Sequence, residues 1–211
     1  MNEPHGTLPD LDLAGARCLV VGLAREGTAL ARYLAEHGAA VTVTDARPAD
    51  ALEHTQAALA GLPLAFALGG HPLSLLDEAQ ILFVSPGVPL EIPLLAEARR
   101  RGLPLSSETR LFTRLCPAPI VGITGSSGKT TTTTLTGAML KASGLTTWVG
   151  GNIGTPLIDQ LDAIAANDRI VLELSSFQLE LFDPALCLGE PVSTRVAGML
   201  NVTPNHLDRH P

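Results

Sequence analysis

Short apolar runs alternate along the chain with segments whose apolar residues recur at helical spacing. The apolar runs predict buried strands at residues 17–22, 41–44, 64–68, 81–84, 120–123, 146–149, 170–174 and 195–201. The helical spacing predicts helices at residues 26–37, 51–60, 93–101, 106–114 and 129–143, and one more after Pro156. Strands that alternate with helices in this way are typical of α/β proteins.

Two prolines, Pro117 and Pro119, interrupt this pattern before the strand at 120–123, so we predict one domain over residues 1–115 and a second over 116–211. The first domain is predicted to be Rossmann-like, because its first βαβ unit ends in Asp45, about 20 residues after Gly22. The turn between strand and helix, Gly-Leu-Ala-Arg-Glu-Gly at 22–27, lacks the G-x-G-x-x-G spacing. A dinucleotide-dependent dehydrogenase is therefore disfavoured.

Composition and charge narrow the class further. The chain is 45% hydrophobic but only 3% aromatic, which favours cores of aliphatic side chains. A net charge of -7 and the lack of a basic run argue against nucleic acid as a partner. No apolar run approaches the roughly 20 residues that span a bilayer, and the acidic N-terminus lacks a signal-peptide pattern, so we expect a cytoplasmic protein without a membrane partner. The spacing of Cys18, Cys116 and Cys187 indicates neither disulfides nor a zinc site.

A glycine turn with a lysine follows the apolar strand at 120–123 and opens the predicted helix at 129–143. Gly125 and Gly128 allow backbone N–H groups to point at an anion, Lys129 adds a positive charge, and Thr130 offers a hydroxyl to Mg²⁺. The alternative is a capped helix start whose hydroxyls bond only the local backbone. The order strand, glycines, lysine and helix favours phosphate binding, and hence a nucleoside triphosphate.

Two further residues are candidates for metal chemistry. Glu173 lies near the end of an apolar strand, where a carboxylate must be paired, metal-bound or exposed at the strand tip. His206 follows the last predicted strand and is a ligand for a divalent ion, a phosphate contact, or a solvated side chain. The segment Gly-Gly-Asn-Ile-Gly at 150–154 either brings an amide to a ligand or is an ordinary turn.

Taken together, these segments resemble the Mur ligases, and among them the branch that adds D-glutamate. The resemblance covers essentially the whole chain and rests on motifs at residues 22–27, 85–87, 125–130, 151–154, 173–179 and 201–210. The segment Glu-Leu-Ser-Ser-Phe-Gln at 173–178 is the most specific to this branch. The short loop Gly-Ser-Ser-Gly-Lys-Thr is shared with folylpolyglutamate synthetases, which lack a leading domain of this type.

The resemblance implies ATP-driven amide formation between UDP-MurNAc-L-Ala and D-glutamate in peptidoglycan synthesis, with ATP and Mg²⁺ as cofactors. Lys129, Glu173 and His206 are the implied catalytic residues, and Thr130, Glu173 and His206 the implied metal ligands. The implied ATP-binding residues are Gly125, Ser126, Ser127, Gly128, Lys129, Thr130, Thr131 and Thr132. The implied substrate-binding residues are Gly22, Leu23, Ala24, Asp45, Ala46, Arg47, Ser85, Gly87, Asn152, Ser175 and Gln178.

Three residues depart from the family pattern: Ser127 replaces an asparagine, Ala46 a threonine, and Asn205 an acid. Asn205 matters most, since a carboxylate beside a metal ligand contributes charge and orientation. The family also has a lysine after the histidine and a third domain, whereas the lysines here are Lys129 and Lys141. We therefore expect residues 1–115 to form a UDP-sugar-binding domain and residues 116–211 to form an incomplete P-loop ATPase domain. We also expect the chain to be inactive by itself and the full-length protein to be a monomer. A non-catalytic module that binds UDP-sugar or ATP is the alternative.

Overall fold

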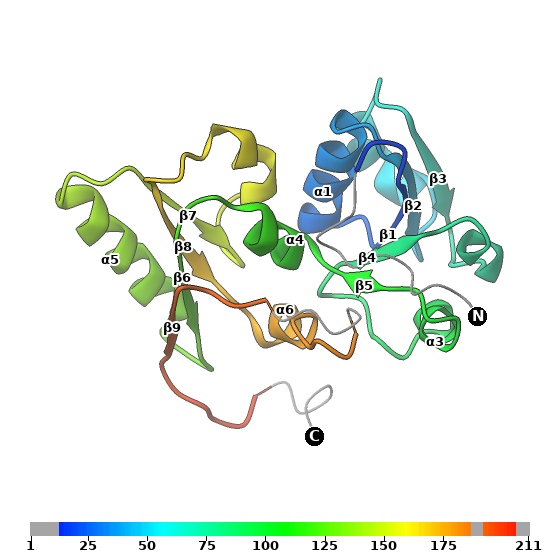
Figure 1. The fold of residues 1–211 in the computed structure, drawn as a ribbon. Coiled ribbons are helices and arrows are strands. Elements are labelled where there is room, and N and C mark those ends of the chain that lie inside the picture. Colours follow the sequence, from blue (N-terminus) through cyan, green and yellow to red (C-terminus); the bar gives the residue numbers. More distant parts are fainter. Residues whose placement is uncertain (1–12, 187–191, 206–211) are drawn as a thin grey trace, which may run out of the picture.

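The computed structural model describes residues 13–186 and 192–205, which form two parallel sheets flanked by helices (Figure 1). The first sheet has the strand order β3-β2-β1-β4-β5 and the second has the order β7-β8-β6-β9. All paired strands in both sheets are parallel. The predicted α/β class is confirmed, and the order of the first sheet is that of a doubly wound fold.

The strands of the first sheet are β1 (Arg17–Val21), β2 (Ala40–Asp45), β3 (Leu64–Leu68), β4 (Ile81–Val84) and β5 (Leu105–Ser106). Its helices are α1 (Arg25–Glu36), α2 (Glu53–Ala57) and α3 (Pro93–Arg100), with 3-10 turns η2 (Asp50–Leu52) and η3 (Leu73–Leu76). The strands of the second sheet are β6 (Ile120–Thr124), β7 (Thr147–Gly151), β8 (Arg169–Glu173) and β9 (Val196–Met199). The remaining helices are α4 (Glu108–Leu115), α5 (Lys129–Ala142), α6 (Ser176–Glu180) and the 3-10 helix η4 (Leu157–Ala163).

Two apolar cores hold these elements. One face of the first sheet packs on α3, where Leu94 and Leu95 are fully buried against Leu19 and Leu82. The other core is continuous between the two sheets. It contains α1, α4 and η4, and α4 lies between the two sheets in Figure 1. The first and second sheets are therefore joined by a shared core rather than by a flexible linker.

Two predicted helices differ from the structure, and one short helix was not predicted. The helix predicted at 51–60 is only the short α2 after a 3-10 turn, because its buried residues Leu52 and Leu59 are too few to form an apolar stripe. The segment after Pro156 is the 3-10 helix η4 rather than an α-helix. The sequence did not predict α6, a short helix whose N-terminus is capped by Ser175.

Ser107 is the residue that caps the N-terminus of α4, and it is fully buried. Its side-chain oxygen accepts a hydrogen bond from the Arg110 backbone N–H at 3.1 Å. Loss of such a cap costs about 1 kcal/mol, so we expect Ser107→Ala to lower the melting temperature by roughly 2–4 °C. Calorimetry checks this, with the exposed Ser74→Ala as the matched control. Equal shifts for the two variants would contradict a capping role.

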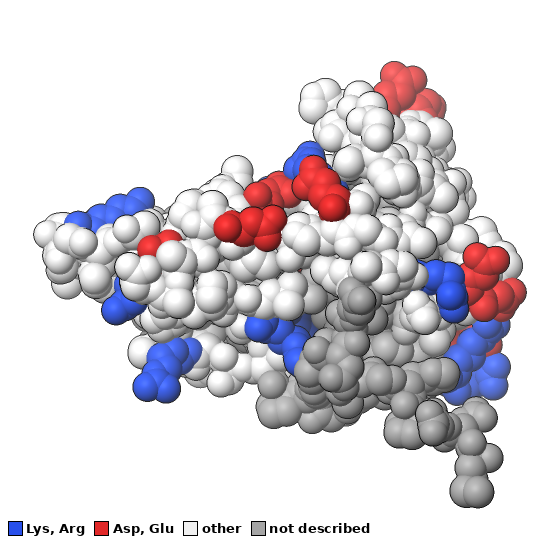
Figure 2. Space-filling view, turned by 45° about the horizontal axis from the view of Figure 1, so that its top comes forward, with Lys and Arg blue, Asp and Glu red and all other residues white. Residues whose placement is uncertain are grey.

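The surface carries charges of both signs. On the face shown in Figure 2, the basic side chains of the described residues form separate small groups, some of which lie beside acidic side chains. Within residues 13–186 and 192–205, no helix has both the length and the apolar composition needed to cross a bilayer.

Candidate functional site

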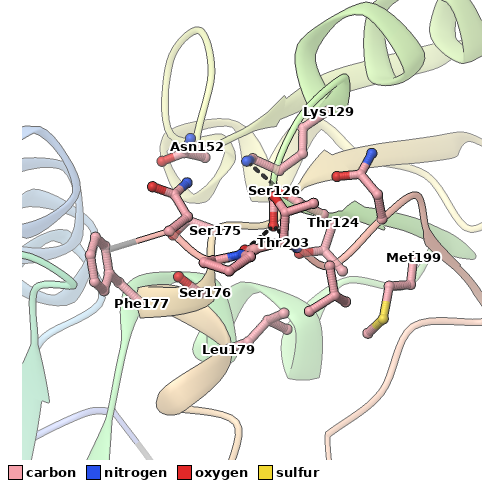
Figure 3. Close-up of a pocket in the computed structure, with 15 residues that line it drawn as sticks. Thr124, Ser126, Lys129, Asn152, Ser175, Ser176, Phe177, Leu179, Met199 and Thr203 are labelled. Carbon is pink, nitrogen blue, oxygen red and sulfur yellow. Dashed lines mark hydrogen bonds between the residues drawn. The ribbon is translucent and has the colours of Figure 1, made fainter. Parts of the chain in front are cut away.

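A pocket of about 650 Å³ opens at the carboxyl ends of the strands of the second sheet (Figure 3). Residues that follow β6, β7, β8 and β9 line it, since parallel strands bring their carboxyl ends to one edge. Lys129, Asn152 and Ser175 lie around the same space in Figure 3, although they come from three distant segments. The sequence predicted all three as site residues.

The loop between β6 and α5 forms one wall of the pocket. Gly125 and Gly128 have φ angles of 144° and 81°, a region of backbone conformation that side chains disfavour. Gly128 precedes the first residue of α5, so the N-terminal N–H groups of that helix follow the turn directly. The Lys129 ammonium group donates to the Gly125 carbonyl at 2.7 Å and thereby folds back over the loop.

Of the eight predicted ATP-binding residues, three line the pocket: Gly125, Ser126 and Lys129. The other five lie in the loop or the first turn of α5: Ser127, Gly128, Thr130, Thr131 and Thr132.

Asn201 fixes this loop from the side of β9. Its side-chain oxygen accepts from the Ser127 N–H at 2.9 Å, and its amide nitrogen donates to the Ser127 carbonyl at 3.1 Å. Its backbone carbonyl accepts from the Ser126 N–H at 3.0 Å. The Ser126 hydroxyl donates to the Thr203 carbonyl at 3.0 Å, and the Thr203 N–H donates back at 2.9 Å. Sequence reasoning missed Asn201 as a site residue, although it begins the motif that contains His206.

Glu173 ends β8 at the centre of the second sheet and is 2% exposed. One carboxylate oxygen accepts from the Thr130 hydroxyl at 2.8 Å, and the other accepts from the Asn152 side-chain amide at 2.8 Å. Glu173 is thus paired with two neutral donors rather than with a cation. The structure brings together Thr130 and Glu173, which the sequence predicted as metal ligands.

The remaining predicted metal ligand, His206, lies outside the described residues. Asn205, its neighbour, lines the pocket. Among the residues that the structure describes, no group of three or more His, Cys, Asp or Glu side chains could hold a metal ion.

The carboxyl edge of the first sheet brings together the predicted residues around Asp45. Its carboxylate accepts from the Leu23 N–H at 2.7 Å and from the Arg47 guanidinium at 2.8 and 2.9 Å. Burial alone would raise the pKa of Asp45, but these hydrogen bonds outweigh it and lower the pKa to about 2. The Arg47 guanidinium also donates to the Leu23 carbonyl at 3.2 Å. Asp45 therefore holds the glycine turn to the end of β2.

The other predicted substrate residues of this sheet lie near the same turn. The Ser85 hydroxyl donates to the Gly22 carbonyl at 2.8 Å and is buried. A side chain at Gly27 would collide with the Gly22 carbonyl, so the turn and α1 approach more closely than any other residue allows. Ala24 and Ala46 are exposed, and Gly87 has open space where a side chain would be.

Gln178 does not line the pocket, although the sequence placed it beside the substrate. It is fully buried in α6, and its amide nitrogen donates to Glu26 at 2.8 Å and to the Thr109 hydroxyl at 3.0 Å. Its side-chain oxygen accepts from the Ser175 N–H at 2.9 Å and from the Ser175 hydroxyl at 3.2 Å. In this structure Gln178 thus links the two sheets, and its predicted role in substrate binding stays a prediction.

A second buried carboxyl group, Glu108, belongs to the same network. Thr109 donates to it at 3.1 Å, and the Ile158 N–H donates at 3.3 Å. Burial raises the pKa of Glu108 to about 8, and the nearby Glu26 acts in the same direction. Burial also raises the pKa of Glu26 to about 7, although Arg25 and the bonds to Gln178 and Thr109 oppose this. Neither glutamate was predicted from the sequence to be buried or to belong to a site.

Comparison with known proteins assigns each of the two parts of the chain to a domain family. Residues 16–107 match the family "Mur ligase MurD-like, N-terminal domain", and residues 123–211 match "Mur ligase middle domain". The chain is 46% identical over 200 residues to the UDP-N-acetylmuramoylalanine--D-glutamate ligase of Geobacter metallireducens, covering 95% of this chain and 43% of that protein. It is 49% identical over 203 residues to the protein of the same name from Anaeromyxobacter dehalogenans, covering 95% and 42%.

Solved structures agree on the fold. The UDP-N-acetylmuramate:L-alanyl-gamma-D-glutamyl-meso-diaminopimelate ligase from Neisseria meningitides superposes with a TM-score of 0.54 at 20% identity, covering 94% of this chain and 64% of that one. UDP-N-acetylmuramate-alanine ligase MurC from Thermotoga maritima gives a TM-score of 0.51 at 20% identity, covering 92% and 43%. The family matches and the shared fold together show that the chain belongs to the Mur ligases and carries their MurD-like N-terminal domain and their middle domain.

Proposed function

We propose that this chain supplies the UDP-sugar site and the ATP phosphate site of a ligase that joins D-glutamate to UDP-MurNAc-L-Ala. The observation that carries the proposal is the loop after β6, where Lys129 folds back over the glycine turn and the Thr130 hydroxyl bonds the buried Glu173. The relatives named as D-glutamate ligases support the choice of substrate. Because the chain spans about 43% of the length of the first of these relatives, the joining reaction is proposed for the whole protein.

ATP is proposed to bind with its phosphates against the loop at 125–132. N–H groups at a helix N-terminus carry partial positive charge, and a lysine adds a full one. Within the described part of the chain, the Lys129 ammonium group bonds only to a backbone carbonyl, so it is able to turn toward a phosphate. The proposal extends to this phosphate-binding part, and it does not require that residues 116–211 form a complete ATPase domain.

Mg²⁺ fits the donors present beside this loop. Thr130 offers a hydroxyl and Glu173 a carboxylate, and Mg²⁺ prefers oxygen ligands, of which one or two come from the protein and the rest from phosphates and water. Among the residues that the structure describes, no cationic side chain bonds the buried Glu173, which leaves its charge to be offset by a metal ion. When bound, Mg²⁺ neutralises charge on the transferring phosphate. A second ion held by Glu173 and His206 stays a prediction.

UDP is proposed to bind at the carboxyl edge of the first sheet, in the part of the chain that we assign to residues 1–115. Ligands of doubly wound sheets bind at this edge, where the first strand turns into its helix. The pair Asp45 and Arg47 holds that turn in place. The proposed contacts are Gly22, Leu23, Ala24, Asp45, Ala46, Arg47, Ser85 and Gly87, with Asn152, Ser175 and Gln178 toward the muramoyl-alanine end.

The proposed reaction proceeds in two steps. The carboxylate of the alanine attacks the γ-phosphorus of ATP, which forms an acyl phosphate and releases ADP. The amine of D-glutamate then attacks the acyl carbon and loses a proton, and the C–O bond to phosphate breaks. Lys129 and the loop N–H groups are proposed to hold the phosphoryl group and to offset its charge. A cytoplasmic location and a monomeric state stay predictions.

Thermal unfolding of this chain with three ligands tests the proposed sites. At a hundredfold excess over Kd, a ligand stabilises a protein by about 2.7 kcal/mol, which corresponds to roughly 5 °C or more for a chain of this size. We expect such shifts with UDP-MurNAc-L-Ala and with ADP and Mg²⁺, and no shift with NADH. Stabilisation by NADH alone, or by none of the three, would overturn the proposal.

A further inference from the structure

Arg25 is the first residue of α1 and lies in the glycine turn of the first sheet, yet its side chain contacts the second sheet. Its guanidinium donates to the Gly154 carbonyl at 2.9 Å, to the Asn152 carbonyl at 3.0 Å and to the Gly151 carbonyl at 3.3 Å. These three carbonyls belong to the last residue of β7 and to the loop that follows it, more than a hundred residues along the chain. One rigid, planar cation therefore gathers the whole loop at 151–154.

The loop that Arg25 holds is also bound to Glu173. The Asn152 side-chain amide donates to the Glu173 carboxylate at 2.8 Å, and its backbone N–H donates to the Glu173 carbonyl at 2.9 Å. Gly151 has a φ angle of 95°, and any side chain there would collide with the Glu173 carbonyl. The loop thus lies directly against Glu173 on one side and is held by Arg25 on the other.

The orientation of the Glu173 carboxylate depends on the two donors that it has. Asn152 binds one oxygen, and Thr130 binds the other at 2.8 Å. If the loop moved, the Asn152 amide would no longer bind the Glu173 carboxylate. Thr130 alone would then hold the carboxylate, which could rotate more easily about the terminal side-chain bond of Glu173. Groups that orient a ligating carboxylate affect metal affinity by 10-fold to 100-fold although they do not touch the metal.

We propose that Arg25 is a positioning residue, which holds the loop at 151–154 so that Asn152 keeps Glu173 oriented toward Mg²⁺. This inference rests on the proposed function, because it requires Mg²⁺ beside Glu173 when nucleotide is bound. It also joins the two sites: the turn that is proposed to bind UDP carries the side chain that orders the proposed metal ligand. Arg25 touches neither ligand in this role.

Arg32 provides a matched control. It also lies on α1 and also reaches the second sheet, where it forms an ion pair with Asp159 at 3.0 Å. Its hydrogen bonds among the described residues go to Asp159 of η4 and to the Ala58 carbonyl, and none of them reaches the loop at 151–154. Loss of Arg32 therefore removes a link between the sheets without releasing Asn152.

The test is the affinity for ADP, measured by titration calorimetry with Mg²⁺ and with EDTA, in the wild type, Arg25→Ala, Arg25→Lys and Arg32→Ala. We expect Arg25→Ala to reduce the gain in affinity that Mg²⁺ gives by about tenfold, and to leave the affinity in EDTA unchanged. Arg25→Lys should recover only part of this loss, since an ammonium group does not reproduce the planar fork. Arg32→Ala should keep the wild-type gain.

Hydrogen exchange of the segment at 150–154 reports the first link directly. Exchange should be faster in Arg25→Ala than in Arg32→Ala, at equal distance from the melting temperature of each variant. Equal gains from Mg²⁺ in the two alanine variants would overturn the positioning role, as would unchanged exchange in Arg25→Ala. If the wild type gained no affinity for ADP from Mg²⁺, the proposed metal site would be wrong, and the role of Arg25 would fall with it.

Discussion

Replacement of Glu108 by glutamine is expected to flatten the dependence of folding stability on pH between about 5 and 8. Burial raises the pKa of Glu108 from 4.5 to about 8 and that of Glu26 from 4.5 to about 7. Between these limits the folded state binds protons that the unfolded state has lost, so stability falls as pH rises. The contribution of Glu108 alone is on the order of 3–5 kcal/mol across this interval.

Glutamine suits this position because it has the shape of a protonated glutamate and carries no charge. Glu108 faces Glu26 from α1, Thr109 from its own helix, and Ile158 and Asp159 from η4. An ionised Glu108 is repelled by both acids, whereas a neutral amide is not. We therefore expect Glu108→Gln to be more stable than the wild type at pH 8.

Urea unfolding at a series of pH values measures this effect. In Glu108→Gln the remaining slope should come from Glu26 and should end near pH 7. The exposed Glu53→Gln is the matched control and should keep the wild-type slope. The interval avoids the opposite effect of Asp45, whose pKa is lowered to about 2 and whose contribution is lost only in acid. An unchanged slope in Glu108→Gln would contradict the assignment.

Lys129→Ala is expected to weaken ADP binding by roughly 10-fold to 100-fold, since a hydrogen bond to a charged group contributes about 1.5–3 kcal/mol. The sequence contains one other lysine, Lys141, which is exposed in the last turn of α5. Lys141→Ala removes the same charge from the same helix at its opposite end. It should bind ADP as the wild type does.

Titration calorimetry with ADP and Mg²⁺ measures the loss, and UDP-MurNAc-L-Ala provides an internal control on each variant. Its affinity should be equal in Lys129→Ala and Lys141→Ala, because neither lysine is among its proposed contacts. Equal ADP affinities in the two variants would show that the loop does not use its lysine for phosphate. A loss of both ligands in Lys129→Ala would indicate a general folding defect instead.

The sequence predicted eight of the nine described strands and missed the two-residue β5, and the success with the longer strands has a physical reason. A strand in a parallel sheet is covered on both faces and must be apolar throughout, which makes it easy to recognise. The short helices were harder, since α2 buries few residues and α6 is polar and depends on its cap. In α6, Gln178 is also bound by the distant residues Glu26 and Thr109, which no local pattern reveals.

The candidate site shows the same division. Lys129, Thr130 and Glu173 were predicted together because they belong to motifs that resemble those of the Mur ligases. The structure brings Thr130 and Glu173 together at the carboxyl edge of the second sheet. The contacts of Arg25 with the loop at 151–154, and of Asn201 with Ser127, were not predicted. Both join residues far apart in sequence, and no local pattern distinguishes such a side chain from a solvated one.

The order of the strands also has a consequence for how the chain folds. In the first sheet β1 pairs with β2, the next strand along the chain, so Arg17 pairs with a residue close in sequence, Ala40. In the second sheet β6 lies between β8 and β9, so Val121 cannot pair until the distant Val171 and Val196 have been synthesised. Contacts between residues so distant form slowly. During synthesis, the loop between β6 and α5 therefore leaves the ribosome well before β8 and β9, which pair with β6 on either side.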